Sequence, residues 1–107
     1  MPTIRIDYDD RQLKDEEILS LSEAAQKIVQ KITGIEDTFV YAQSPHIKVK
    51  IAPIELYVQI SAGKVKDIDA LFQAIKEEVM VWKKESSFRH SINLTLMPMQ
   101  WKFEVGL

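Results

Sequence analysis

Apolar and polar residues alternate in several short segments of the chain, which is the pattern of strands with one buried face. The first such segment covers residues 3–9, and the longest covers residues 54–61. Two longer segments, residues 14–33 and residues 68–82, instead repeat apolar residues every three or four positions. That spacing predicts two amphipathic helices, each with one apolar stripe that packs against the strands.

Other alternating segments are shorter or contain an interruption. Residues 38–43 form a short β-type run, and residues 92–96 alternate up to Pro98, which we expect to interrupt that strand. Residues 47–51 alternate isoleucine and valine with lysine, so we predict an extended segment there that lies at an edge. Residues 99–105 alternate as well, and neither of the last two segments has an obvious partner strand within the chain.

The order strand, helix, strand occurs twice, in halves that cover about residues 2–45 and 53–101. The halves share their pattern and almost no sequence, and Pro2 and Pro53 each open one of them. Two βαβ units with right-handed crossovers predict an α+β fold, in which a four-stranded mixed sheet carries both helices on one face. We expect residues 1–107 to form a single domain.

The other face of this sheet is predicted to be too polar for a core and too rich in β-forming residues for a loop. A lone sheet of this kind also has two open edges. Both features predict oligomerisation in which subunits cover one another's faces and edges. The residues expected on this face are Thr3, Arg5, Glu55, Tyr57, Gln59, Asn93 and Thr95.

The amino-acid composition argues against several classes of function. The 14 Lys and Arg residues nearly balance 16 Asp and Glu residues, so no nucleic-acid partner or acidic membrane is expected. There is no cysteine, and the two histidines, His46 and His90, are isolated and interpreted as solvent-facing, so no metal or cofactor is expected. No apolar run is long enough for a membrane span, and the polar start is no signal peptide, which predicts a cytoplasmic location.

The Met-Pro start, the doubled βαβ pattern and the Pro-Ile that opens the second half resemble the tautomerase superfamily. The best local match is Ser61-Ala62-Gly63-Lys64-Val65, which is similar to a Ser-Ile-Gly-Lys-Ile segment of the family's migration inhibitory factors. The resemblance implies a homotrimer whose active sites lie at subunit boundaries, close to the N-terminal proline. It also implies a small carbonyl or keto-acid substrate.

Removal of Met1 would expose the secondary amine of Pro2. An α-amino group has a pKa of about 8 in water, and burial or a neighbouring cation lowers it. A neutral amine near pH 7 is suited to take a proton from the carbon next to a carbonyl and to return it elsewhere. We therefore predict a cofactor-independent tautomerase with Pro2 as its general base.

The resemblance implies seven substrate-binding residues around Pro2. Three lie in the turn after the first strand of the second half, and two belong to the final strand and the tail, where they serve a neighbouring subunit. The others are an aromatic residue after the first helix and an arginine after the first strand. In this order they are Ser61, Ala62 (through its backbone N–H), Lys64, Asn93, Trp101, Phe39 and Arg11.

One position departs from the family pattern. Ile35 stands where migration inhibitory factors have a lysine that helps to hold a carboxylate, and Lys64, Arg11 or Arg5 would have to replace it. Two alternatives therefore stay open. The order βαββαβ is shared with ferredoxin-like domains that bind small ligands, and the chain could also be a tautomerase-fold trimer without activity.

Overall fold

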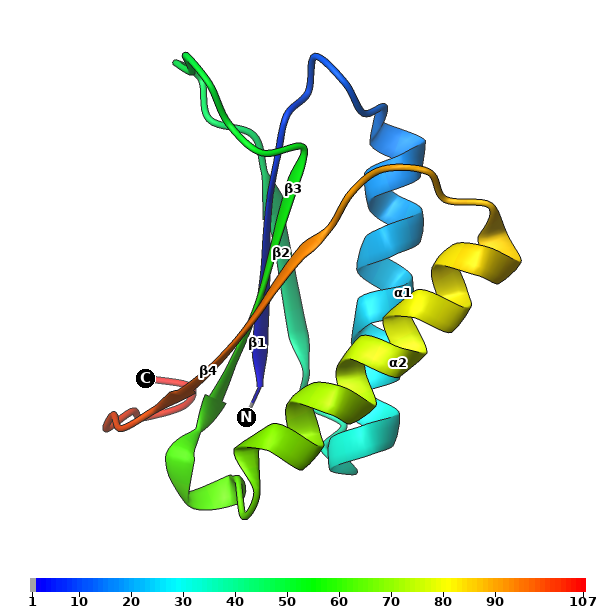
Figure 1. Ribbon diagram of the computed structural model, residues 1–107. Helices are drawn as coiled ribbons and strands as arrows, with labels where there is room; N and C mark the ends of the chain where they lie inside the picture. Colours follow the sequence, from blue (N-terminus) through cyan, green and yellow to red (C-terminus); the bar gives the residue numbers. More distant parts are fainter. Residues whose placement is uncertain (1) are drawn as a thin grey trace.

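The computed structural model describes residues 2–107, in which the predicted order of elements occurs twice (Figure 1). The first half consists of β1 (Thr3–Tyr8), α1 (Asp15–Thr33) and β2 (Phe39–Gln43), and the second of β3 (Ile54–Ser61), the 3₁₀ helix η1 (Ala62–Lys64), α2 (Ile68–Ser86) and β4 (Asn93–Met99). The strand order is β2-β1-β3-β4, with parallel outer pairs and an antiparallel central pair. Both helices cover one face of the sheet (Figure 1). The predicted fold class is confirmed.

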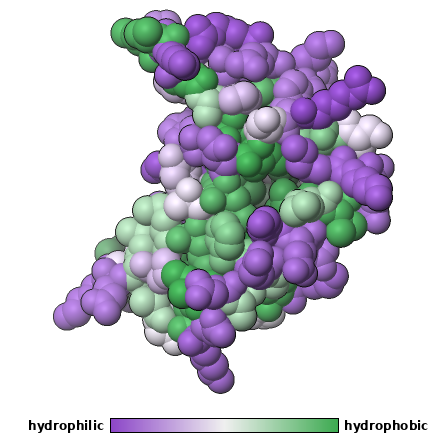
Figure 2. Space-filling view, viewed as in Figure 1, coloured by the Kyte–Doolittle hydropathy of each residue, from purple (hydrophilic) through white to green (hydrophobic). Residues whose placement is uncertain are grey.

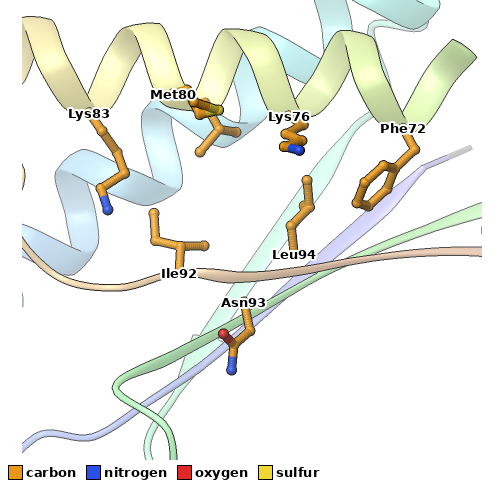
Figure 3. A pocket seen from close by; sticks show the side chains of 8 residues that line it. Phe72, Lys76, Met80, Lys83, Ile92, Asn93 and Leu94 are labelled. Atoms are coloured by element: carbon orange, nitrogen blue, oxygen red, sulfur yellow. The ribbon is translucent and has the colours of Figure 1, made fainter.

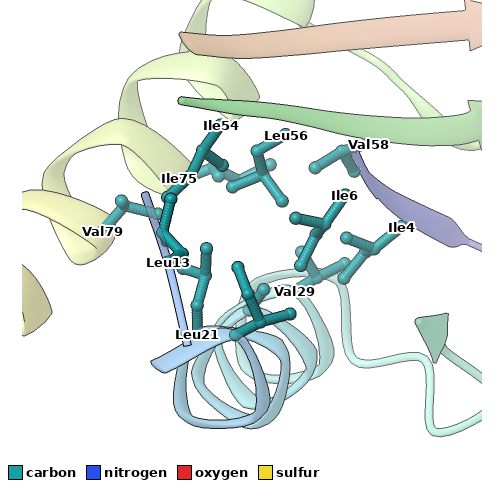
Figure 4. Packing of buried hydrophobic residues seen from close by; sticks show 12 residues of the cluster. Ile4, Ile6, Leu13, Leu21, Val29, Ile54, Leu56, Val58, Ile75 and Val79 are labelled. Carbon is teal, nitrogen blue, oxygen red and sulfur yellow. The ribbon is translucent and has the colours of Figure 1, made fainter. Parts of the chain in front are cut away.

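The core lies between this face and the helices (Figure 4). Every second residue of the two central strands is buried there, because side chains in a strand alternate between the two faces. The helices contribute residues from one stripe each. Strand residues of the core are Ile4, Ile6, Ile54, Leu56 and Val58, and helix residues are Ile18, Leu21, Ala25, Val29, Ile75 and Val79.

α1 begins and ends close to the predicted bounds, and α2 begins as predicted but continues beyond residue 82 to Ser86. The side chain of Glu17 accepts the backbone N–H of Lys14 at 2.9 Å, which satisfies a free donor at the start of α1. Gly34 ends α1 in the left-handed region, with a φ of 71° that favours glycine. At the start of α2, Asp67 Oδ1 accepts the N–H of Ala70 at 3.1 Å.

The uncovered face carries the mixed residues that the alternation predicts. The register sets Arg5 between Tyr41 on β2 and Tyr57 on β3. The Arg5 guanidinium lies 5.1 Å from the centre of the Tyr57 ring, a cation–π distance. Arg5 and Tyr41 are exposed in the single chain.

Two predictions about strands are wrong. Pro98 does not interrupt the last strand, because β4 continues to Met99 with Pro98 opposite Ile60. β4 is an edge strand, so one of its sides faces away from the sheet, and an edge strand is where a sheet tolerates proline. Residues 100–107 form no strand, so the predicted extended segment ends at Met99.

The segment at residues 47–51 is also not a strand. It belongs to the loop between β2 and β3, which extends beyond the end of the sheet (Figure 1). Ile47 is 85% exposed and Val49 is 92% exposed. The alternation is present, but within residues 2–107 no neighbouring strand pairs with it.

His46 is exposed as expected, whereas His90 is not the solvent-facing residue that we predicted. Its Nε2 lies 2.7 Å from Glu17 Oε2, and its ring packs edge-on against Phe88. The sequence does not reveal this pair because 73 residues separate its members. No helix in the described part of the chain is long and apolar enough to cross a membrane.

Candidate active site at the Pro2 end of the sheet

Pro2 is fully buried at the start of β1. Its carbonyl oxygen accepts the backbone N–H of Phe39 at 3.3 Å, so the chain is already fixed to β2 before the first strand begins. Pro2 precedes Ile4 by two positions and therefore lies on the helix-covered side of the sheet. The predicted removal of Met1 concerns a residue outside the described range.

The strand directions bring several of the predicted residues to the same end of the sheet as Pro2. Because β1 and β3 are antiparallel, the start of β1 lies beside the end of β3, and Thr3 pairs with Gln59. The parallel outer pairs add the start of β2, where Thr3 pairs with Phe39, and the end of β4. Both ends of the chain and η1 are at this end in Figure 1.

Ser61 and η1 form the turn that follows β3. Ser61 and Ala62 are half-buried, whereas Lys64 is exposed, so its ammonium group extends into solvent in the single chain. The backbone N–H of Val65 bonds to the carbonyl of Ala62 at 3.2 Å and closes the turn. The turn thus provides polar groups and one cation at the Pro2 end.

Trp101 lies in the tail just after β4, with its ring edge-on to Phe103 at 6.4 Å between centres. Its indole nitrogen Nε1 is buried and has no hydrogen-bond acceptor among residues 2–107. A buried donor without a partner is costly, because it loses its hydrogen bond to water and gains none in return. In the single chain, the described part of the tail therefore contains a buried hydrogen-bond donor without a partner.

Arg11 and Asn93 lie at the opposite end of the sheet. Arg11 follows the end of β1, and Asn93 begins β4 beside Glu55, the second residue of β3. A strand of six residues separates them from Pro2 by about 20 Å. Within one chain these two residues therefore do not meet Pro2, and their predicted roles could apply only to another subunit's site.

Both residues are held by carboxylates at that end. Arg11 donates from Nε to Asp9 Oδ1 at 2.8 Å and from Nη2 to Asp9 Oδ2 at 3.0 Å. The side-chain nitrogen of Asn93 donates to Glu55 Oε1 at 3.0 Å. Asp9 was not predicted from the sequence as a partner of Arg11, although an acid two positions before an arginine is a local sign of such a pair.

The hydrogen bonds from Arg11 and Gln12 hold the pKa of Asp9 well below its ordinary value. Asp9 in turn raises the pKa of Arg11. Asp9 is only 2% exposed, so an uncompensated charge would be costly there. The buried charge of Asp9 is thus stable in this loop because Arg11 and Gln12 satisfy the hydrogen bonds of its carboxylate.

A groove between α2 and β4 was not predicted from the sequence. Its volume is about 440 Å³, and apolar side chains make up much of its wall. Figure 3 shows Lys83 extending from α2 toward Ile92, and Lys76 on the strand side of α2 above Leu94. In Figure 2 an apolar area lies in this region, with polar atoms around it. The groove is a second surface that could hold a ligand.

No protein-family model and no curated protein sequence matches this chain. Solved structures do match. A fused 4-OT in an asymmetric trimer has a TM-score of 0.68 at 15% identity and covers 97% of this chain and 92% of its own. For malonate semialdehyde decarboxylase the TM-score is 0.67 at 14% identity, and the match covers 98% of this chain and 92% of that one. For a macrophage migration inhibitory factor-like protein from Entamoeba histolytica the TM-score is 0.61 at 13% identity, and the match covers 96% of this chain and 95% of that one.

The chain has the tautomerase-superfamily fold. The resemblance drawn from the sequence is thus confirmed at the level of the fold, over nearly the whole chain. Within this fold, Ile35 follows Gly34, the C-cap of α1, and presents no cation. Among the predicted substrate-binding residues, Lys64 is the cation that lies at the Pro2 end of the sheet.

Replacement of Asp9 by asparagine tests the charged loop. Because the pKa of Asp9 is lowered on folding, its stabilising contribution is present above its unfolded pKa of about 4 and is lost as the pH falls through the folded value. We expect Asp9→Asn to lower the urea midpoint at pH 7 and to differ less from the wild type at pH 2.5. Urea denaturation followed by circular dichroism at both pH values measures this, with Asp10→Asn as the control.

Proposed function

We propose that the protein is a cofactor-independent tautomerase that uses the amine of Pro2 as general base on a small carbonyl or keto-acid substrate. The observation that carries this proposal is the burial of Pro2 at the sheet end where Ser61, η1 and Trp101 also lie. The fold of the structural neighbours supports it, since they include 4-OT and malonate semialdehyde decarboxylase.

The environment of Pro2 suits a neutral amine. Burial disfavours the ammonium form, so the pKa of a proline amine in such a place falls toward neutrality. The ring fixes φ, and the bond from Phe39 N–H to the Pro2 carbonyl fixes the peptide beyond it. A base with a fixed direction removes the proton without a further ordering cost.

The enolate formed in this step requires hydrogen-bond donors or cations. Ser61, the backbone N–H of Ala62 and Lys64 are the groups that this end of the chain offers. Donors directed at the developing negative charge stabilise the transition state more than the substrate, which is how they accelerate the reaction. Ile35 presents no charge, so among the predicted residues Lys64 is the cation that a substrate carboxylate would meet at this end.

The active form is proposed to be a homotrimer with sites between subunits. Three features of the single chain support this: the uncovered face of the sheet, the buried Trp101 Nε1 without an acceptor, and the position of Arg11 and Asn93 about 20 Å from Pro2. A neighbouring subunit could supply the acceptor and bring its own Arg11 and Asn93 to Pro2. Fused 4-OT structures that are trimers support the same assembly.

Replacing the base is the direct test of the mechanism. We expect Pro2→Ala to reduce turnover of phenylpyruvate or a 2-hydroxydienoate at least about tenfold, equivalent to about 1.4 kcal/mol in the barrier, because the primary amine has a different direction and basicity. The matched control is Pro53→Ala, which changes the proline that opens the second half. Wild-type turnover by Pro2→Ala, or a mature protein that keeps Met1, would rule out the mechanism.

The trimer is tested by removing the indole N–H of Trp101, which has no acceptor in the described part of the chain. The chain mass is 12.4 kDa, so sedimentation should give three times this value for the wild type. Trp101→Phe keeps an aromatic ring and removes only the N–H group. If a subunit contact satisfies that group, the variant should dissociate at roughly fivefold higher concentration, corresponding to about 1 kcal/mol. The control is Phe103→Leu, and an unchanged dissociation constant in Trp101→Phe would count against the contact.

The second candidate function is the binding of a small amphipathic anion, and the groove between α2 and β4 favours it. Its apolar wall suits a hydrocarbon group, and Lys76 and Lys83 provide charge complementarity for a carboxylate. Neither lysine has a carboxylate within ion-pair distance in the described part of the chain. This function needs no free Pro2 amine.

Octanoate is a suitable probe of that candidate. We expect Lys83→Met to weaken its binding roughly tenfold in calorimetry, because methionine keeps an apolar chain and removes the charge. Lys84→Met, an adjacent substitution outside the groove, should bind octanoate as the wild type does. Octanoate binding that is absent, or equal in both variants, would reject the groove as an anion site.

A further inference from the structure

The groove between α2 and β4 has two positively charged side chains in its wall, Lys76 and Lys83, and both come from α2. Asn93 also lines the groove, but Figure 3 shows its side chain pointing away from α2, and it donates to Glu55 Oε1 at 3.0 Å. The other lining residues form an apolar wall, which consists of Phe72, Val79, Met80, Ile92 and Leu94. An anion in the groove would therefore meet two cations beside an apolar surface.

Neither lysine has an acid as a neighbour on the helix. Side chains three or four positions apart on a helix lie next to each other. Around Lys76 and Lys83 these positions hold apolar residues, one glutamine and two serines, namely Phe72, Gln73, Val79, Met80, Ser86 and Ser87. Lys31 of α1, in contrast, lies 2.9 Å from Glu78, whereas neither groove lysine forms an ion pair within residues 2–107. Both ammonium groups can therefore bind an anion from solution.

The spacing of the two lysines separates their charges along the groove. They are seven positions apart, which corresponds to about 10 Å along the helix axis and to nearly two full turns. Both therefore lie on the same side of α2. In Figure 3, Lys83 extends toward Ile92 and Lys76 lies above Leu94, so each lysine is opposite a different residue of the facing segment. The apolar wall lies between the two charges.

A ligand that uses both charges needs a carboxylate at each end and a hydrocarbon chain between them. Its hydrocarbon part would cover Met80, which is 59% exposed in the single chain, and remove apolar surface from water. The volume of about 440 Å³ is within the range of small-molecule sites. Extended nonanedioate is long enough to place one carboxylate at each lysine across the spacing of about 10 Å.

We propose that the groove between α2 and β4 binds a linear dicarboxylate, with one carboxylate at Lys83, the other at Lys76 and the hydrocarbon chain along the apolar wall. This inference rests on the second candidate function, the binding of an amphipathic anion, and names the class of its ligand. The two cations favour this class over a neutral or cationic amphiphile, because such a molecule would leave both lysines without a counter-charge.

Calorimetry with nonanedioate and octanoate tests the inference, because octanoate is nonanedioate with a hydrogen in place of one carboxylate. We expect nonanedioate to bind the wild type about fivefold more tightly, the contribution of one further exposed ion pair. Lys76→Met should remove this difference and leave octanoate binding nearly unchanged, because methionine keeps an apolar chain and removes only the charge. Lys83→Met should weaken the binding of both ligands.

Two controls address chain length and overall charge. Butanedioate has the same two charges but little hydrocarbon, so it should bind at least about tenfold more weakly than nonanedioate. Lys84→Met removes a neighbouring charge outside the groove and should bind nonanedioate as the wild type does. Equally tight binding of butanedioate, or an equal loss of nonanedioate binding in Lys84→Met and Lys76→Met, would overturn the inference.

The outcomes also separate this inference from the function on which it rests. If octanoate binds in the groove but nonanedioate binds no more tightly, or if Lys76→Met keeps the difference between them, only the preference for a dicarboxylate fails. If neither ligand binds, the second candidate function fails and the inference fails with it. The result for Pro2→Ala does not affect either conclusion, because the groove needs no free Pro2 amine.

Discussion

The antiparallel pairing of β1 with β3 is the constraint on which the rest of the molecule depends. Each half of the chain is a parallel βαβ unit, and this pairing joins the two units into one sheet with a common helix-covered face. It buries alternate residues of both central strands, which form the sheet side of the core. It also decides which residues share an end of the sheet, because it sets the start of β1 beside the end of β3.

The same pairing divides the predicted site residues into two groups. Pro2, Phe39, Ser61 and η1 come together because two strand starts and one strand end meet there. Arg11 and Asn93 are sent to the opposite end, where carboxylates hold them. A single chain thus carries the proposed base at one end and two of the predicted substrate-binding residues at the other.

Much of the fold could be predicted from the sequence because its signals are local. The apolar stripes define both helices, Gly34 and Asp67 mark a helix end and a helix start, and the period of two in residues 54–61 gives β3. Predictions failed where the outcome depends on a neighbouring strand. Pro98 is tolerated because β4 is an edge strand, and residues 47–51 alternate without a strand to pair with.

The candidate site was less predictable, for the same reason. Pro2 and the turn after β3 could be named because short motifs resemble a known family. The burial of Asp9 could not be predicted, although its spacing from Arg11 is a local sign of their pairing. The pair of His90 with Glu17 could not be predicted either, because these residues meet only after folding. The groove between α2 and β4 arises from the spacing of two elements, which no single segment encodes.

The acidic side chains at the Arg11 end of the sheet each have a partner. A buried acid is stable only when its hydrogen bonds are satisfied, and Asp9 satisfies them with Arg11 and Gln12. Each of three acids in this region has its own partner, since Asp10 meets Lys48 and Glu55 meets Asn93. Removing one partner would free an acid to compete for Arg11. The cation keeps an open side because its neighbours are already engaged, so the direction of Arg11 is a property of the whole loop cluster.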